Sequence, residues 1–277
     1  MIKLIAIDID GTLLNRKGRI PAANLAAIHR AAAMGVRVVI ATGRSVRFAL
    51  QVLGDLPDDL TLLAHNGAIA RTRAGETLLR RLLPRDAAQL VLAATLSWRG
   101  DTTAVFDRPH GGQLVYDRMD WTLPYRWGFK EKNHEIMRAV PDLAGALTED
   151  PVQIAFNGSV AAMRELVTHL DAHPVSARLE ISRTEYPGRN FAMVDVCAAG
   201  TSKGSGLAEV AAIFEVAQDE VMAVGDNHND HAMLARAGTG VVMGNAEPEL
   251  RRHGFHETGT NDQAGLAQAI RKFILET

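Results

Sequence analysis

Short apolar runs recur in the first and last parts of the chain, with stretches of helical periodicity between them. The runs span residues 4–7, 36–41, 60–64, 221–224 and 240–243. Their length, β-branched content and polar or glycine borders predict buried parallel strands, because a strand covered on both faces reads as a continuous apolar run. The alternation of strand and helix predicts a doubly wound, Rossmann-like α/β fold with a parallel sheet.

Two segments between these runs predict helices that pack on the sheet. Pro21 suits a first helical turn and Gly35 suits a helix C-terminus, so the first helix should lie between them. The second helix should lie within residues 205–216. The apolar positions on one face are Leu25, Ile28 and Ala32 in the first helix, and Leu207, Val210, Ala211 and Phe214 in the second.

The middle of the chain breaks this rhythm. From about residue 84 to residue 187 the pattern is mixed, and "FNGSV" at residues 156–160 is typical of a hairpin. We therefore expect a core domain made of residues 1–83 and 189–277, with an α+β domain inserted at residues 84–188.

Composition narrows the classes of protein that remain. The 277 residues are 47% apolar, and 30 basic residues against 32 acidic ones give a net charge of −2. Global charge therefore offers no reason to expect a nucleic-acid partner or a charged membrane surface. No apolar run approaches the ~20 residues that span a bilayer, the start lacks the features of a secretory signal, and a lone Cys197 excludes an internal disulfide. We expect a soluble, cytoplasmic protein.

Three polar clusters follow apolar runs, so all three can lie at the carboxyl edge of one sheet, where ligands bind in such folds. The clusters are "DIDGT" with Asp8, Asp10, Gly11 and Thr12, "ATGR" with Thr42 and Gly43, and "GDNHND" with Asp226, Asn229 and Asp230. Carboxylates this close repel one another unless a cation neutralises them, they share a proton, or one of them pairs elsewhere. Hard oxygen ligands suit Mg²⁺, whereas a site without thiolates and with one nearby histidine does not suit zinc.

Other residue types add positive charge and hydrogen-bond donors. Lys203, in "TSKGSG", can meet a phosphate or offset a carboxylate. Gly11 lets the backbone approach a ligand, and the amides after Thr42 form an anion site if a helix begins there. Thr42 could instead only cap the helix that starts near Ser45. Arg44 is expected to form a salt bridge.

The motifs "DIDGT", "TGR", "SKG" and "GDNHND", in this order, resemble the four motifs of the haloacid dehalogenase-like hydrolases. "NGA" at residues 66–68, "MGNA" at 243–246 and the long insert are similar to the Cof-like phosphatase branch, whose members have an inserted cap domain. The resemblance covers the core, and it does not extend to a substrate signature in the insert.

The resemblance implies a role for each motif residue. Asp8 would be the nucleophile that forms an aspartyl-phosphate, and Asp10 would be the general acid and base. An aspartate at the second position favours phosphate esters as substrates. The phosphoryl group would be held by Asp8, Gly11, Thr42, Gly43, Lys203 and Asn229. Mg²⁺ would be held by Asp8, the Asp10 carbonyl, Asp226 and Asp230, unless Asp230 instead orients Lys203 or holds a metal-bound water.

We therefore expect a magnesium-dependent phosphatase that acts on a small soluble phosphomonoester, either a sugar phosphate or a nucleotide-like metabolite, with specificity in the insert. Two alternatives stay open. A phosphomutase or phosphotransferase would return the phosphoryl group to a sugar hydroxyl, and a signalling module would be phosphorylated without turnover. The sequence does not choose between a monomer and a homodimer.

Overall fold

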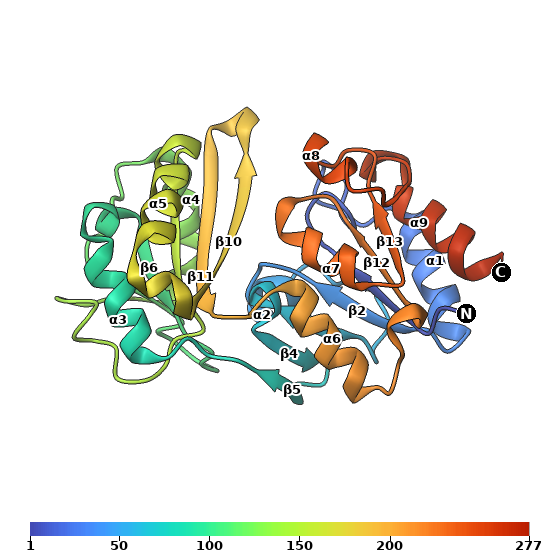
Figure 1. Ribbon diagram of the computed structural model, residues 1–277, viewed down its shortest axis with the longest axis horizontal. Helices are drawn as coiled ribbons and strands as arrows, with labels where there is room; N and C mark the ends of the chain where they lie inside the picture. The colour runs from blue at the N-terminus through green and yellow to red at the C-terminus, as the bar shows by residue number, and fades with distance from the viewer. Residues whose placement is uncertain (277) are drawn as a thin grey trace. The chain divides into compact units, whose positions relative to one another are not determined.

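The computed structural model describes residues 1–276, with the side chains at positions 124, 125, 127, 132 and 187 left undescribed. The chain divides into two compact units (Figure 1). Met1–Arg80 and the chain from Thr201 onward form the first unit, and Arg81–Gly200 form the second. The boundary expected after residue 188 lies between strands β10 (Leu179–Tyr186) and β11 (Phe191–Ala198), which pair with each other along their whole length.

The first unit is built on an eight-stranded sheet in the order β14-β13-β12-β1-β2-β3-β4-β5. Its strands are β1 (Leu4–Ile7), β2 (Arg37–Ala41), β3 (Thr61–Ala64), β4 (Ile69–Thr72), β5 (Thr77–Arg80), β12 (Val221–Gly225), β13 (Thr239–Val242) and β14 (His256–Glu257). The six strands from β14 to β3 are parallel, which confirms the predicted α/β core. The antiparallel strands β4 and β5 extend one edge, and the apolar pattern had not predicted them.

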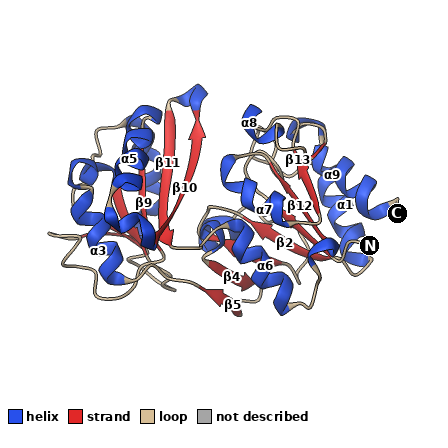
Figure 2. Cartoon of the chain, viewed as in Figure 1, coloured by secondary structure: helices blue, strands red, loops and turns tan. Residues whose placement is uncertain are grey.

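Helices cover both faces of this sheet (Figure 2). The helices are α1 (Ala22–Ala33), α2 (Val46–Leu50), α6 (Lys203–Ile213), α7 (His231–Arg236), α8 (Pro248–Arg251) and α9 (Gly265–Ile270), with short 3₁₀ helices at His65–Gly67, Gln218–Glu220, His228–Asp230 and Asn261–Gln263 and a π-helical turn at Arg271–Leu275. Ile28 of α1 packs with Ile5 and Ile7 of β1. Leu207 of α6 packs with Leu4, on the opposite face of the same strand. This two-sided burial explains why β1 is apolar at every position.

The second unit has a six-stranded sheet in the order β10-β11-β9-β6-β7-β8. Its other strands are β6 (Thr102–Val105), β7 (Leu114–Tyr116), β8 (Met137–Ala139) and β9 (Gln153–Gly158); its helices are α3 (Arg85–Ala94), α4 (Pro124–Asn133) and α5 (Val160–Ala172), with 3₁₀ turns at Leu96–Asp101, His134–Ile136, Pro174–Arg178 and Pro187–Arg189. Leu166 of α5 and Val91 of α3 share one apolar core with Phe156 of β9. The sheet is antiparallel apart from the β7–β8 pair, so this unit is α+β.

The prediction of a hairpin at "FNGSV" is wrong. Gly158 ends β9, and Ser159 is the N-cap of α5, where its side chain accepts a hydrogen bond from the Ala162 amide. The serine therefore starts a helix instead of a turn between two strands.

Among the described residues, no helix has the length and apolar character needed to cross a membrane.

Candidate active site

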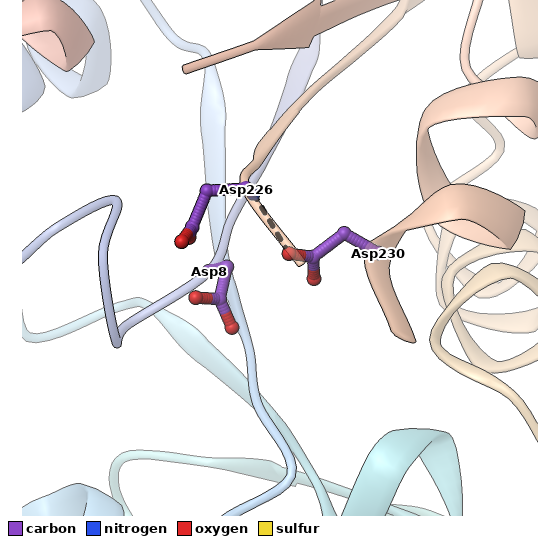
Figure 3. A group of neighbouring side chains, drawn as sticks. All are labelled: Asp8, Asp226 and Asp230. Atoms are coloured by element: carbon purple, nitrogen blue, oxygen red, sulfur yellow. Dashed lines mark hydrogen bonds between the residues drawn. The ribbon is translucent and has the colours of Figure 1, made fainter. Parts of the chain in front are cut away.

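Three carboxylates meet where neighbouring parallel strands end (Figure 3). Asp8 follows β1 and Asp226 follows β12, and these strands pair in register, with Ile7 opposite Val224. The third carboxylate, Asp230, ends the 3₁₀ helix after β12. One oxygen from each of the three lies within 4.8 Å of the other two, and all three side chains are buried. We call Asp8, Asp226 and Asp230 the acidic triad.

Lys203 lies against this triad. Its Nζ donates to Asp8 Oδ1 at 2.6 Å and to Asp230 Oδ1 at 2.6 Å, and the side chain is 1% exposed. Burial alone would lower the pKa of Lys203, but the charges of Asp230 and Asp8 and their hydrogen bonds outweigh burial and raise it. The ammonium is therefore fixed in its charged form, and three carboxylates still face one cation.

This imbalance raises the proton affinity of the triad. The pKa of Asp8 rises from 3.8 to about 7, chiefly because of burial and then because of the charge of Asp230, although Lys203 opposes the rise. Burial, Asp8 and Asp230 also raise the pKa of Asp226 well above its ordinary value. A site of this kind binds either protons or a further cation at neutral pH.

Two residues of the loop after β1 shape the position of Asp226. The Thr12 hydroxyl donates to Asp226 Oδ1 at 2.8 Å in a fully buried hydrogen bond. Gly11 has φ +91°, and a Cβ at this position would overlap the Asp226 carboxylate. Both a positive φ and this close approach therefore require glycine.

Asp230 already uses both of its carboxylate oxygens. Oδ1 accepts from Lys203, and Oδ2 accepts from the amides of Asp226 and Asn227 at 2.9 and 3.0 Å. Of the roles expected for Asp230, this geometry favours orienting Lys203 over binding a metal directly.

Asp10 lies outside the triad and pairs with Arg44. The Arg44 Nε donates to Asp10 Oδ2 at 2.7 Å, and Nη2 donates to Oδ1 at 2.6 Å. The salt bridge expected of Arg44 is thus present, in a two-point geometry that lysine cannot reproduce. The Asp10 side chain is 42% exposed, so Arg44 orients a carboxylate that solvent can reach.

The loop after β2 places Thr42 close to Asn66. Thr42 is buried; its carbonyl accepts from the Asn66 amide at 3.0 Å, and its Oγ1 accepts from the Arg44 amide at 3.1 Å. Thr42 does not cap the next helix, because Ser45 is the N-cap of α2. The alternative of Thr42 as a simple helix cap is therefore wrong.

Asn66 joins this loop to the loop after β12. Its Oδ1 accepts from Asn229 Nδ2 at 3.0 Å, and its amide lies over Gly43, where an added Cβ would be 3.0 Å from Oδ1. Residues 65–67 all have positive φ, between 51° and 98°. Backbone strain of this kind is concentrated at functional sites. Thr42, Gly43 and Asn229 are thus brought together around Asn66.

The ligand atoms of the acidic triad are of the kind that a magnesium ion prefers. Mg²⁺ prefers hard oxygen ligands and usually takes one or two carboxylates together with water and substrate oxygens. Within the described part of the chain, Oδ2 of Asp8 and Oδ2 of Asp226 accept no hydrogen bond, so both remain available as ligands.

The sequence analysis did not single out Asn245. Its side chain donates to the Gly11 carbonyl, and its place in "MGNA" was a signal that could have identified it.

Comparisons with known proteins agree with the motifs. The family model of the haloacid dehalogenase-like hydrolases matches residues 5–270. The chain is 29% identical over 279 residues to the 5-amino-6-(5-phospho-D-ribitylamino)uracil phosphatase YcsE of Bacillus subtilis (strain 168), covering 99% of this chain and 96% of that protein.

Two solved structures extend the comparison over the whole fold. BT1666 from Bacteroides thetaiotaomicron, a phosphatase of the haloalkanoate superfamily, is 28% identical, with a TM-score of 0.80 and coverage of 99% of this chain and 95% of that one. The subclass IIB sugar phosphatase BT4131 is 26% identical, with a TM-score of 0.79 and 98% coverage of both chains. The chain belongs to the haloacid dehalogenase-like hydrolases and is a phosphatase of their Cof-like branch.

Proposed function

We propose that this protein is a magnesium-dependent phosphatase that hydrolyses a small soluble phosphomonoester through an aspartyl-phosphate on Asp8. The position of Lys203 Nζ, 2.6 Å from both Asp8 Oδ1 and Asp230 Oδ1 in a buried site, is the observation that supports this most strongly. Lys203 orients the Asp8 carboxylate by donating to Oδ1, and Oδ2, which accepts no hydrogen bond from the described residues, remains for the metal ion. Such a carboxylate suits a nucleophile.

In the first step, a carboxylate oxygen of Asp8 attacks phosphorus while the bond from phosphorus to the ester oxygen breaks. Asp10, in its protonated form, gives its proton to the leaving oxygen. Lys203 and the hydroxyl of Thr42 stabilise the charge on the transferring phosphoryl group. The products of this step are the free alcohol and a phosphoryl group bonded to Asp8.

In the second step, Asp10 accepts a proton from a water molecule whose oxygen attacks the same phosphorus. The bond between phosphorus and the Asp8 oxygen breaks, and inorganic phosphate leaves with Asp8 restored as a carboxylate. In the structure Arg44 donates to both oxygens of Asp10 and so directs the carboxylate that accepts the proton in this step.

Asp8, Asp226 and the Asp10 carbonyl would hold the magnesium ion, and Asp230 would fix Lys203 or hold a metal-bound water. When bound, the ion supplies positive charge that lets the buried carboxylates and the anionic substrate coexist. The buried hydrogen bond from Thr12 keeps Asp226 in place for this task.

The inserted unit, Arg81–Gly200, would act as the cap domain that selects the substrate. Two comparisons bear on the substrate class: YcsE is named as a phosphatase of a phosphoribitylaminouracil, and BT4131 is named as a sugar phosphatase. A phosphorylated sugar or polyol, or a nucleotide-like metabolite that contains one, is therefore the class to test first.

The test is phosphate release from a panel of sugar phosphates, nucleotides and an aryl phosphate, with and without Mg²⁺, for wild type and Asp8→Asn. We expect Mg²⁺-dependent release that the substitution abolishes. Transfer of phosphate to a second sugar without release would indicate a mutase. A long-lived phosphorylated Asp8 without turnover would indicate a signalling module, and either result would overturn the proposal.

A further inference from the structure

The loop that follows β1 is held by three asparagine side chains, one from the next helix, α1, and two from near the end of the chain. This loop begins at the proposed nucleophile, and its first two carbonyls, those of Asp8 and Ile9, accept from the amides of Leu13 and Leu14. The bonds are Asn245 Nδ2 to the Gly11 carbonyl at 2.9 Å, Asn24 Nδ2 to the Leu13 carbonyl at 3.3 Å, and Asn261 Nδ2 to the Leu14 carbonyl at 2.8 Å. Each asparagine side chain thus donates a hydrogen bond to one backbone carbonyl of the loop.

Asn245 binds the peptide that lies between the proposed catalytic residue Asp10 and Thr12, the partner of Asp226. The Gly11 carbonyl belongs to the peptide between Gly11 and Thr12, the next peptide after the one that carries the Asp10 carbonyl. In a planar trans peptide the C=O and the N–H point in opposite directions, so a hydrogen bond to the Gly11 carbonyl also fixes the direction of the Thr12 amide. Thr12 is the residue whose hydroxyl holds Asp226. Gly11, at φ +91°, has no side chain of its own to restrict this peptide.

Asn245 is itself held rigidly. Its Oδ1 accepts from the Asn261 amide at 2.8 Å, so the side-chain amide has a fixed orientation with its donor group toward Gly11. The neighbouring backbone also contacts the end of β12 and the loop after it: the Met243 amide donates to the carbonyl of Gly225, the last residue of β12, at 3.0 Å, and the Glu247 amide donates to the Asp226 carbonyl at 3.1 Å.

Residues 243–247 therefore contact both loops that carry the proposed metal ligands. Backbone amides at the two ends of this segment bind the carbonyls of Gly225 and Asp226, and the side chain of Asn245, near its middle, binds the loop of Asp8 and Asp10. The Asn245 side chain therefore adds a link between the two loops, besides the direct hydrogen bond from Thr12 to Asp226, through a residue that belongs to neither loop.

We propose that Asn245 is a positioning residue for the metal site: by binding the Gly11 carbonyl, it sets the loop after β1 against the loop after β12 in the geometry that binds Mg²⁺. This inference rests on the proposed function for its metal and its turnover. Partners that orient metal ligands without touching the metal commonly contribute about 10- to 100-fold to metal affinity or activity.

Asn261 provides a matched control. Asn245→Ala removes one side-chain bond to a loop carbonyl and one bond accepted from a backbone amide, those to Gly11 and from Asn261. Asn261→Ala also removes one of each kind, those to Leu14 and from Asp262. The two variants lose bonds of the same kinds, but only the first frees the peptide between Gly11 and Thr12.

The experiment is a thermal-shift titration with Mg²⁺ alone, followed by kcat and KM with the best phosphomonoester. For Asn245→Ala we expect the Mg²⁺ concentration at half-maximal shift to rise about tenfold or more and kcat to fall similarly, with KM within about threefold of wild type. For Asn261→Ala we expect a comparable loss of stability without Mg²⁺ but an unchanged Mg²⁺ midpoint. If Asn245→Ala does not fold, Asn245→Ser is measured and interpreted in the same way.

Equal Mg²⁺ midpoints for the two alanine variants, or a midpoint for Asn245→Ala equal to that of wild type, would overturn the inference and leave the proposed function intact. A wild-type protein without any Mg²⁺-dependent shift or phosphate release would overturn both.

Discussion

Asp8→Asn should stabilise the metal-free protein at alkaline pH even though it should abolish catalysis. Asp8 is buried beside Asp230 and near Asp226, and its pKa is raised to about 7. The asparagine has the same shape, still offers an oxygen to Lys203, and removes one of three mutually repelling charges. A residue kept for chemistry is here expected to reduce stability.

The direction and size of the effect follow from the raised pKa. Between pH ~4 and ~7 the folded protein keeps a proton on Asp8 that the unfolded chain has already released, so wild-type stability falls as pH rises through this window. A shift from 3.8 to about 7 corresponds to at most ~4 kcal/mol at pH 8. For a domain of 150 to 250 residues this is a gain in Tm of up to ~8 to 16 °C, and structural relaxation and entering water will reduce it.

The assay is thermal unfolding in a chelator at pH 5 and pH 8. Asp8→Asn should unfold several degrees above wild type at pH 8, with less than half of that gain at pH 5, and added Mg²⁺ should narrow the gap. Asp10→Asn is the control, because its half-exposed carboxylate pairs with Arg44 and is a smaller cause of the raised pKa of Asp8 than burial or Asp230, so its removal should give a smaller gain. Equal or lower stability of Asp8→Asn at pH 8, or a gain that does not change with pH, would refute the reasoning.

Three further predictions concern other parts of the molecule. Arg44→Lys loses the two-point contact with Asp10, so kcat should fall about tenfold or more with KM nearly unchanged; an unaltered kcat would contradict a positioning role. Gly11→Ala should abolish both phosphate release and Mg²⁺-dependent stabilisation, whereas Gly18→Ala, also at positive φ but with open space around it, should cost only about 1 kcal/mol in denaturant unfolding and keep activity. Cys197, whose thiol pKa is raised by burial and by nearby carboxylates, should not react with a thiol reagent at pH 8 until the protein is unfolded.

The parts of the fold that sequence predicted are those with a local signal. The run at residues 4–7 coincides with β1, and the run at 221–224 lies within β12, because strands buried on both faces must be apolar throughout. The carboxylates of Asp8 and Asp226 follow these strands directly. Once the strands are recognised as neighbours, the meeting of the two carboxylates follows from the fold.

Some features that the sequence did not predict depend on contacts between residues far apart in the chain. Others have a local sequence pattern that is weak or ambiguous. β5 is at the edge of its sheet and half-exposed, so it lacks a continuous apolar run. "FNGSV" contains turn-forming residues, but its serine caps α5 instead. The Asn245 bond to Gly11 joins residues 234 positions apart, and the Arg44 pair with Asp10 joins residues 34 apart. Local periodicity says nothing about either partner.

The most direct test of the proposed mechanism is acid quench during turnover with Mg²⁺, followed by mass spectrometry of the peptide that contains Asp8. We predict that this peptide carries one phosphoryl group while substrate remains, that the group disappears as phosphate release ends, and that Asp8→Asn shows neither the group nor release. Steady phosphate release with Asp8 never phosphorylated, or release by Asp8→Asn at a rate near that of wild type, would contradict the mechanism.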